Sequence, residues 1–293
     1  MNIKPVVGRK GATEKIKSVM KTKLSSFKNV LFPIRADLDN SCTYSIIRKL
    51  FDTIDSSTHI IASVGKTSLG REIVNKEKWV EVSIDLNRLQ NDYMHDEPAF
   101  EGKVQVDLVC KDYETIVNEN LSSGKYDLVI FTLPYTHSDS NLAYVEMIER
   151  TLSTKRISVL IVPESSEKIR INKTVIISRF NTLRLDLALE IASFVKTRMN
   201  STSHLLNLLG EAEKSDSVIS AHLSRLKSLK DVANVTYSNK HMSLNCLSLD
   251  KASSLRPDLI VRIIRDEISD FQLKYDYGGE CIFGTTPVLM LFS

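Results

Sequence analysis

Thr-His-Ile-Ile-Ala-Ser-Val-Gly, residues 58–65, is followed 145 residues later by Ser-His-Leu-Leu-Asn-Leu-Leu-Gly, residues 203–210. Both stretches are largely apolar runs that end in glycine, a pattern typical of a buried strand followed by a turn. The same offset relates Asn-Val-Leu-Phe-Pro-Ile at 29–34 to Thr-Val-Ile-Ile-Ser-Arg at 174–179. A repeat of this length is a whole domain rather than a solenoid unit. The sequence therefore predicts two copies of one unit.

The later parts of the two copies match at smaller offsets. Residues 122–130 correspond to 253–261, an offset of 131, and Val104 corresponds to Val235 at the same offset. The first copy therefore contains 14 more residues, the difference between 145 and 131, between Gly65 and Val104. The closing apolar runs match at an offset of 129, with Val159 opposite Val288.

Within each copy, short apolar runs typical of strands alternate with segments whose apolar residues have helical spacing. The expected strands are 30–34, 60–64, 104–109, 127–131 and 159–162 in the first copy, and 175–178, 205–209, 235–237, 258–263 and 288–291 in the second. Apolar residues at helical spacing follow the first strand of each copy, at Ile47, Leu50, Phe51 and Ile54 and at Leu185, Ala188, Ala192 and Val195. Further helices are expected at 113–122 and about 141–153, and at 211–230, 244–254 and 267–275. The segment 66–102 of the first copy is expected to be longer and less regular than its counterpart. Continuously apolar strands that alternate with helices indicate a parallel sheet covered on both faces.

The expected fold class is therefore α/β, with two tandem, doubly wound, five-stranded parallel sheets. The first unit spans 28–165 and the second 170–293, after a basic tail at 1–27. The two closing strands, 159–162 and 288–291, are expected at the interface of an intramolecular pseudo-dimer, because an unpaired apolar edge strand promotes aggregation.

The charge of the chain is unevenly distributed. Residues 1–28 contain eight basic residues and one acid, a local charge of +7, whereas the whole chain carries +3 and the remainder therefore −4. Ile16, Val19, Met20 and Leu24 fall at near-helical spacing among the lysines, which suits an amphipathic helix on anionic lipid or on a protein partner. A solvated, mobile leader is the alternative.

Several classes of protein are disfavoured by composition. No apolar run approaches the roughly 20 residues of a membrane span, and the first 28 residues lack the apolar core of a signal peptide. The four cysteines have no CxxC spacing, which fits reduced thiols, so a soluble cytoplasmic protein is expected. Nucleic acid is not an expected partner, because the basic residues are not interleaved with aromatic ones and the domains are acidic.

Several motifs of the chain resemble one known family. They are the opening Val-Leu-Phe-Pro-Ile (30–34), the fourth strands Tyr-Asp-Leu-Val-Ile (126–130) and Pro-Asp-Leu-Ile-Val (257–261), the closing runs at 158–163 and 286–291, and Glu149 with Leu152 before the first closing run. In this order they resemble the universal stress protein family in tandem form, over about residues 28–293. Similar tandem units form the cytoplasmic tails of certain cation/proton antiporters and other transporters, so the resemblance implies a regulatory module.

The resemblance also implies where a nucleotide would bind. Nucleotide-binding members use an Asp after strand one and a glycine-rich stretch after strand four, whose backbone N–H groups surround the phosphates. This chain departs from that pattern, since neither 132–138 nor 264–268 contains a glycine. Ligands of open parallel sheets bind at the carboxyl ends of the strands. The candidate site is therefore in the first copy, at Pro33, Arg35, Asp37, Asp39, Ser41, Val64, Gly65, Thr132 and Ser138.

Other readings of these residues remain open. Asp and Asn before a helix commonly serve only as caps. Gly65-Lys66-Thr67 lacks the upstream glycine of a phosphate loop, because position 60 is Ile60. His59 and His204 occupy equivalent strand positions, which suggests packing or capping. No metal-ligand set and no nucleophile with a partnered base is identifiable.

Three functions are considered. The favoured one is a non-enzymatic regulatory module, of the kind linked to stress response, which acts through a protein partner such as a membrane transporter and is cytoplasmic or peripheral to the membrane. The second is a sensor of ATP, AMP or a cyclic dinucleotide. The third is an adenylate-forming enzyme, whose His-x-Gly-His, Lys-Met-Ser-Lys-Ser and Ser-Gly-Gly-x-Asp-Ser loops this sequence lacks. Self-association is a further expectation.

Overall fold

The computed structural model describes residues 27–35, 37–51, 57–68, 71–80, 82–84, 104–134, 139–155, 157–164, 170–178, 182–209, 235–241, 255–264 and 286–292. The basic tail and the helices expected at 211–230, 244–254 and 267–275 lie outside these residues. Phe27, which the sequence placed at the end of the tail, is buried in the core of the first unit.

Ten strands form one sheet. The first unit contributes β1 (Asn29–Ile34), β2 (Ser57–Ser63), β5 (Val104–Val109), β6 (Leu128–Leu133) and β7 (Ser158–Pro163). The second contributes β8 (Lys173–Ser178), β9 (Thr202–Leu209), β10 (Val235–His241), β11 (Leu259–Ile264) and β12 (Val288–Phe292). The spatial orders are β5-β2-β1-β6-β7 and β10-β9-β8-β11-β12, and every pairing within a unit is parallel. Corresponding strands thus occupy corresponding places, which confirms the predicted repeat.

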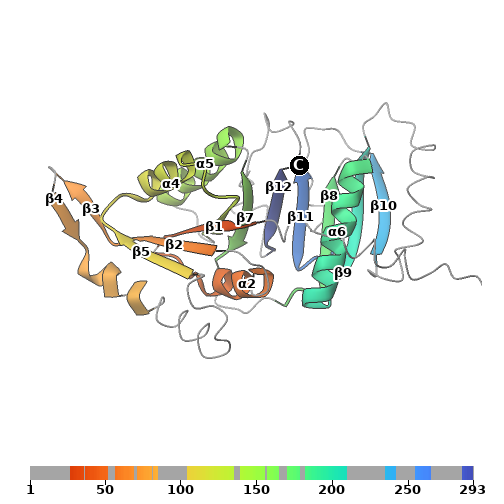
Figure 1. Ribbon diagram of the computed structural model, residues 1–293, viewed down its shortest axis with the longest axis horizontal. Coiled ribbons are helices and arrows are strands. Elements are labelled where there is room, and N and C mark those ends of the chain that lie inside the picture. The colour runs from red at the N-terminus through yellow and green to blue at the C-terminus, as the bar shows by residue number, and fades with distance from the viewer. Residues whose placement is uncertain are drawn as a thin grey trace, which may run out of the picture.

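Helices cover both faces of the sheet in the first unit. In Figure 1, α4 (Tyr113–Ser122) and α5 (Asp139–Lys155) lie on one face and α2 (Ser41–Phe51) lies on the other. The second unit contains α6 (Thr182–Met199), which packs on β8 and β9. Because both faces are covered, every residue of β6 and β7 is buried, as the continuously apolar runs predicted.

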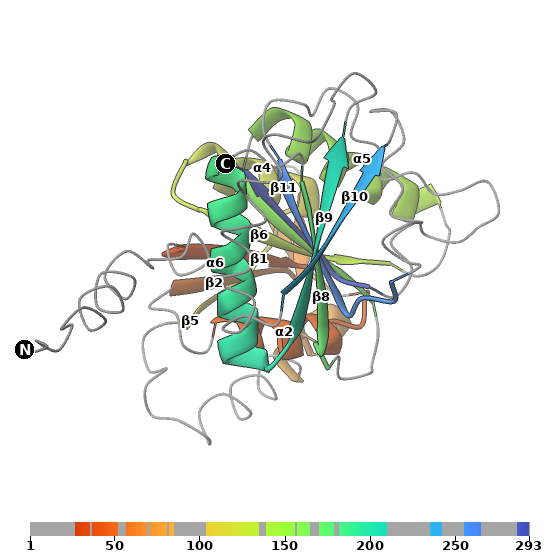
Figure 2. The same cartoon turned by 90° about the vertical axis from the view of Figure 1, so that its right-hand side faces the viewer.

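The closing strands join the two units. β7 and β12 pair antiparallel, with Ile161 opposite Val288, Leu160 opposite Leu289 and Val159 opposite Met290. The expected contact between the closing strands is therefore present as edge-to-edge pairing. It makes one continuous ten-stranded sheet from the two sheets that the sequence predicted. Figure 2 shows the strands fanned about one another, the accumulated twist of a long open sheet.

One aspartate of each unit ties the fourth strand to the first. Asp127 Oδ2 accepts hydrogen bonds from the backbone N–H groups of Lys28 (2.9 Å) and Asn29 (3.1 Å). Asp258, its counterpart at the offset of 131, makes the same pair of contacts with the start of β8, at 2.8 and 3.0 Å. The aspartate of the Tyr-Asp-Leu and Pro-Asp-Leu motifs therefore has a structural role in both units.

The segment after β2 in the first unit differs from expectation. Here the sequence suggested an irregular region, whereas β3 (Gly65–Ser68) and β4 (Arg71–Val74) form an antiparallel hairpin, followed by helical residues at 76–80. In the described part of the chain, these two strands of four residues pair with each other and not with the large sheet, and their sequence contains no long apolar run. Because Gly65 begins a strand, the Gly-Lys-Thr stretch is not a phosphate loop.

The two equivalent histidines link each second strand to the neighbouring edge strand. His59 Nε2 lies 2.8 Å from Asp107 Oδ2 on β5, and its Nδ1 contacts the Tyr126 hydroxyl. His204 contacts the hydroxyl oxygens of Thr236 (2.6 Å) and Ser238 (2.8 Å) on β10. Both histidines therefore have structural contacts between neighbouring strands, as a packing or capping role would require.

His204 should make the stability of the protein sensitive to acid. Burial lowers its pKa below the ordinary value, and the charge of Lys173 lowers it further. The native state then binds fewer protons than the unfolded chain, so stability should be complete above about pH 6.5 and fall as the pH decreases below it. We expect the urea concentration at the midpoint of unfolding to decrease less between pH 7.5 and pH 5.5 in His204→Gln than in the unsubstituted protein. An equal decrease in both proteins would show that His204 does not cause the sensitivity to acid.

None of the helices in the described part of the chain is both as long and as apolar as a membrane-crossing helix must be.

Candidate functional site

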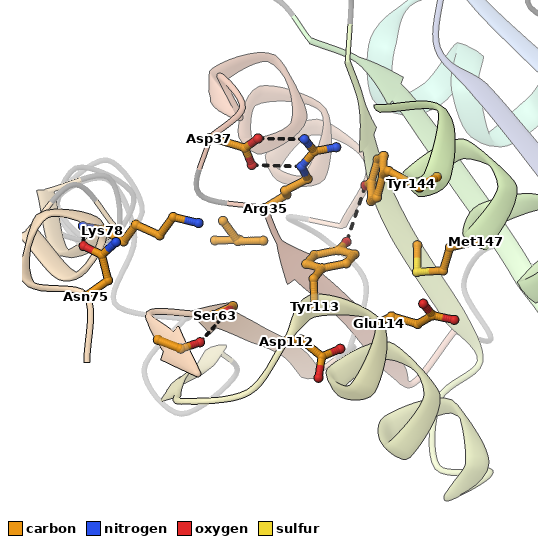
Figure 3. Close-up of a pocket in the computed structure, with 13 residues that line it drawn as sticks. Arg35, Asp37, Ser63, Asn75, Lys78, Asp112, Tyr113, Glu114, Tyr144 and Met147 are labelled. Carbon is orange, nitrogen blue, oxygen red and sulfur yellow. Dashed lines mark hydrogen bonds and ion pairs between the residues drawn. The ribbon is translucent and has the colours of Figure 1, made fainter. Parts of the chain in front are cut away.

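A cavity of about 810 Å³ lies at the carboxyl ends of β1 and β2 in the first unit. Its walls come from the end of β1, the residues after β2, the residues after β4, and the starts of α4 and α5 (Figure 3). β1 has β2 on one side and β6 on the other, so the chain connections diverge here. This is the position at which open α/β sheets bind ligands.

Arg35 and Asp37 form a paired charge at the edge of the cavity. Arg35 Nε donates to Asp37 Oδ1 at 2.8 Å, and Nη2 donates to Asp37 Oδ2 and to Asn141 Oδ1, both at 2.7 Å. The guanidinium lies over the Tyr144 ring, 4.9 Å from its centre. Two parallel hydrogen bonds to one carboxylate fix the orientation of the arginine.

The environment of Asp37 keeps it ionised. Partial burial raises its pKa, but the hydrogen bonds and charge of Arg35, with a smaller contribution from Lys78, outweigh burial and lower the pKa below the ordinary value. Asp37 and Asn141 engage Nε and Nη2 of Arg35, whereas its Nη1 is buried and has no hydrogen-bond partner among the described residues.

Two tyrosines form the inner wall. The Tyr113 hydroxyl donates to the carbonyl oxygen of Pro33 at 2.8 Å, and the Tyr144 hydroxyl donates to that of Thr132 at 3.0 Å. Their rings meet edge to face, with centres 5.3 Å apart. Burial, together with the neighbouring Tyr144, raises the pKa of Tyr113 well above its ordinary value. Tyr113 therefore stays protonated and acts as a fixed hydrogen-bond donor.

Carboxylates occupy the beginning of α4. Asp112 is the N-cap, and its side chain accepts from the backbone N–H of Thr115 at 2.8 Å. The hydrogen bonds from the Thr115 side chain and backbone lower the pKa of Asp112 below its ordinary value. Glu114, in the first turn, pairs with Arg150 at 2.9 Å. A helix N-terminus attracts phosphate, but here two carboxylates of the protein already stand at that position.

The outer wall comes from the residues after β4. Asn75 Oδ1 accepts from the backbone N–H groups of Glu77 (3.1 Å) and Lys78 (3.2 Å), which starts the helical turn. The Lys78 side chain extends from this turn toward Asp37 and Arg35 (Figure 3). Neither the Lys78 ammonium nor the Asn75 Nδ2 has a hydrogen-bond partner within the described residues.

A buried polar network holds the loop between β1 and α2 beside the cavity. Asn40 Nδ2 donates to the carbonyl oxygens of Arg35 (3.2 Å) and Leu38 (2.8 Å), and Asn40 Oδ1 accepts from the Thr132 hydroxyl at 2.7 Å. Thr132 in turn contacts the Thr43 hydroxyl at 2.8 Å. This network connects β6, α2 and the loop that carries Arg35.

Solved structures with the same architecture include a universal stress protein. No family model and no curated protein sequence matches the chain. The universal stress protein from Archaeoglobus fulgidus DSM 4304 superposes with a TM-score of 0.60 at 12% identity, over 90% of this chain and 96% of that one. The fold is that of the universal stress proteins.

Two further structures share this universal stress protein fold. A functionally unknown protein from Pseudomonas aeruginosa PAO1 has a TM-score of 0.57 at 13% identity, over 92% of this chain and 94% of its own. The cytoplasmic domain of a prokaryotic cation chloride cotransporter has a TM-score of 0.51 at 13% identity, over 90% of this chain and 95% of its own. At such low identity the likeness extends to the fold alone.

Three of the nine predicted site residues line the cavity, namely Arg35, Asp37 and Gly65. Pro33 contributes its carbonyl oxygen to Tyr113 from the buried end of β1. Ser138 lies outside the described residues. Whether any of the nine contacts a nucleotide stays a prediction.

The other four predicted residues have structural contacts away from the cavity lining. Asp39 Oδ1 accepts from the backbone N–H of Ser41 at 2.9 Å, the capping role that was the alternative reading of this loop. Val64 is buried in the core, and Thr132 belongs to the polar network.

Sequence reasoning missed most of the lining, including Asn75, Lys78, Asp112, Tyr113 and Tyr144. The rule that ligands lie at the carboxyl ends of parallel strands also covers the residues after strand three, and it would have indicated 112–114. No sequence signal places the hairpin or α5 against this cavity.

Three titratable side chains of the cavity lining are engaged in structural contacts. Asp112 caps a helix, Tyr113 is held protonated, and Asp37 is paired with Arg35. Within the described residues no three of His, Cys, Asp and Glu are grouped as metal ligands. The arrangement suits binding.

Proposed function

We propose that the protein is a non-enzymatic regulatory module that acts through a protein partner, and that this partner is a membrane transporter. One observation carries the proposal: the architecture of the cotransporter's cytoplasmic domain corresponds to 90% of this chain, so the likeness includes both units and not a single α/β domain. Two units joined through β7 and β12 present one continuous body to a partner.

The contacts of the cavity support a role in binding rather than in catalysis. A general acid or base must exchange its proton with a bound molecule. The acidic and phenolic groups here are instead held by Thr115, Pro33 and Arg35. We therefore assign no catalytic residue.

The partner can be tested by capture from membranes of the source cells. Tagged full-length protein is incubated with detergent-solubilised membranes, and bound proteins are identified by mass spectrometry. We expect a polytopic transporter to be enriched, and the enrichment to disappear for Leu289→Asp, which disrupts the junction between the units. Enrichment of no polytopic protein, or equal enrichment with both proteins, would contradict the proposal.

We further propose a cytoplasmic location at the membrane surface, to which the basic tail attaches. Basic residues near an anionic bilayer contribute about 1 kcal/mol each, and salt screens this attraction. We expect the full chain to sediment with anionic liposomes at low salt, while a chain that begins at Phe27 stays in solution and remains folded. The shortened chain retains Phe27 because this side chain is part of the core. Equal sedimentation of both chains at every salt concentration would show that the tail is only a leader.

The alternative function, a sensor of ATP, AMP or a cyclic dinucleotide, is favoured by the position of the cavity at the carboxyl ends of β1 and β2. Its volume of about 810 Å³ suits a ligand of that size. A thermal-shift panel of these nucleotides is the direct test, because ligand binding to the native state raises its apparent stability.

We expect ATP to bind weakly, with a dissociation constant near 1 mM, equivalent to about 4 kcal/mol. The glycines of the family motif are missing after β6, and Asp112 and Glu114 add two carboxylates to the cavity lining at the start of α4. Isothermal calorimetry measures the constant. A micromolar value would overturn this expectation and favour the sensor.

A further inference from the structure

The polar groups that line the cavity are almost all satisfied within the protein. Arg35 pairs with Asp37, Asp112 with Thr115, and Glu114 with Arg150. The hydroxyls of Ser63, Tyr113 and Tyr144 donate to backbone carbonyl oxygens. Such groups offer a ligand little, because binding would require an existing hydrogen bond to be replaced.

Three lining groups are different, and all are donors. Arg35 Nη1 is buried and has no hydrogen-bond partner within the described residues. The Lys78 ammonium and the Asn75 Nδ2 have no partner among the described residues, and both stand on the wall that follows the hairpin of the first unit. Asn75 Oδ1 is occupied by two backbone N–H groups, so its free group is the amide nitrogen. A ligand that complements this wall must supply an acceptor, and opposite an ammonium the strongest acceptor is an anion.

The opposite wall is apolar and aromatic. Ile34, Tyr113, Tyr144 and Met147 line it, and Tyr144 and Met147 are themselves buried. Tyrosine rings and a methionine offer flat and adaptable surface to an aromatic or aliphatic body. The cavity thus combines donors on one side with an apolar surface on the other.

The charge of the lining limits how negative the ligand can be. In the described lining, two cations, Arg35 and Lys78, stand among three carboxylates, Asp37, Asp112 and Glu114. A polyphosphate would meet repulsion from these carboxylates. A single negative charge matches the Lys78 ammonium, which has no hydrogen-bond partner in the described part of the chain.

We propose that the cavity of the first unit binds a small monocarboxylate with an aromatic or aliphatic body. Its carboxylate accepts hydrogen bonds from Lys78 and Asn75, and its body packs on Tyr113, Tyr144 and Met147. The proposal goes beyond the regulatory function by naming the class of ligand, and it does not depend on the identity of the protein partner.

The test uses 4-phenylbutyrate and its neutral isostere 4-phenylbutanamide with the full-length protein. Trp79, the single tryptophan of the chain, is adjacent to Lys78 and half exposed, so its fluorescence reports on this wall. We expect the acid to change the fluorescence saturably and to bind at least about tenfold more tightly than the amide, because the charge-assisted hydrogen bond is lost in the amide. Calorimetry gives the same constants without relying on Trp79.

Matched variants locate the carboxylate. Lys78→Met should weaken binding of the acid about tenfold and leave that of the amide unchanged, because it removes the free ammonium. Lys76→Met is the control, since it removes an equal charge from the same helical turn but not from the lining. Asp37→Asn should strengthen binding of the acid, because it removes the carboxylate beside Lys78.

Three results would overturn the proposal. They are equal affinity for acid and amide, equal effects of the two lysine substitutions, and no saturable binding of the acid at 10 mM, about ten times the constant expected for ATP. Tighter binding of ATP than of the acid would also overturn it, and would favour the nucleotide sensor. Failure of the transporter capture alone would leave these outcomes unaffected.

Discussion

Replacement of Leu289 by aspartate is expected to lower the free energy of unfolding by more than about 4 kcal/mol. Leu289 is fully buried, and it pairs with the equally buried Leu160 at the junction between β12 and β7. A carboxylate at this position would lie among the apolar side chains of the core, which include Leu160 and Leu291, and its charge would be desolvated there. Urea unfolding followed by circular dichroism measures the change.

Val106→Asp is the matched control. Val106 lies on β5, the edge strand of the first unit and one end of the ten-stranded sheet, and 36% of its surface is exposed, so the same charge should change stability by about 0.5 kcal/mol or less. If the two variants were equally stable, the junction would contribute little, and the two units would be independent.

Replacement of Asn40 by alanine is expected to cost about 1–3 kcal/mol, because the carbonyl oxygen of Leu38 loses its hydrogen-bond partner within the described residues. The carbonyl oxygen of Arg35 and the hydroxyl of Thr132 each lose one contact but keep another, from the Leu38 N–H and from Thr43. The Asn40 side chain itself is buried.

Asp39→Asn provides the control for the loop. The amide oxygen of the new side chain can still accept from the Ser41 N–H, so stability should change by about 0.5 kcal/mol or less. Differential scanning calorimetry of both variants measures the contrast. An Asn40→Ala protein as stable as Asp39→Asn would show that the network does not hold this loop.

The repeat was predictable because strands with both faces buried need long apolar runs. The offset between residues 58–65 and 203–210 placed β2 and β9 correctly, and the apolar closing runs predicted the contact of β7 with β12. The sequences of the two closing runs did not predict that they pair antiparallel and so form one sheet of ten strands. The direction of this pairing depends on how the two folded units pack against each other.

The site was predictable only in part. The same types of residue occur at the ends of strands whether they stabilise the fold or bind a ligand, so the sequence alone does not distinguish the two roles. Asp37 and Asp39 are two residues apart, yet Asp37 lines the cavity while Asp39 caps the start of α2. Thr132 belongs to the polar network because its hydroxyl donates to Asn40. The role of such a side chain therefore depends on neighbours that are about 90 residues away in the chain.

The hairpin of β3 and β4 lies in the region in which the first copy is longer than the second. The 14 additional residues were located between Gly65 and Val104 from the offsets alone. That this region places Lys78 and Asn75 on a cavity wall follows from the pairing of β3 with β4, which no periodicity predicted. Asn75 and Lys78 of the cavity lining therefore come from the region in which the two copies differ.

Transport by the captured partner tests the regulatory role most directly. The transporter is reconstituted in proteoliposomes, and the initial rate of substrate flux is measured with and without the full-length protein on the outer surface. We predict at least a twofold change in rate, which Leu289→Asp abolishes. An unchanged rate at saturating protein, with binding demonstrated in the same vesicles, would contradict a regulatory function.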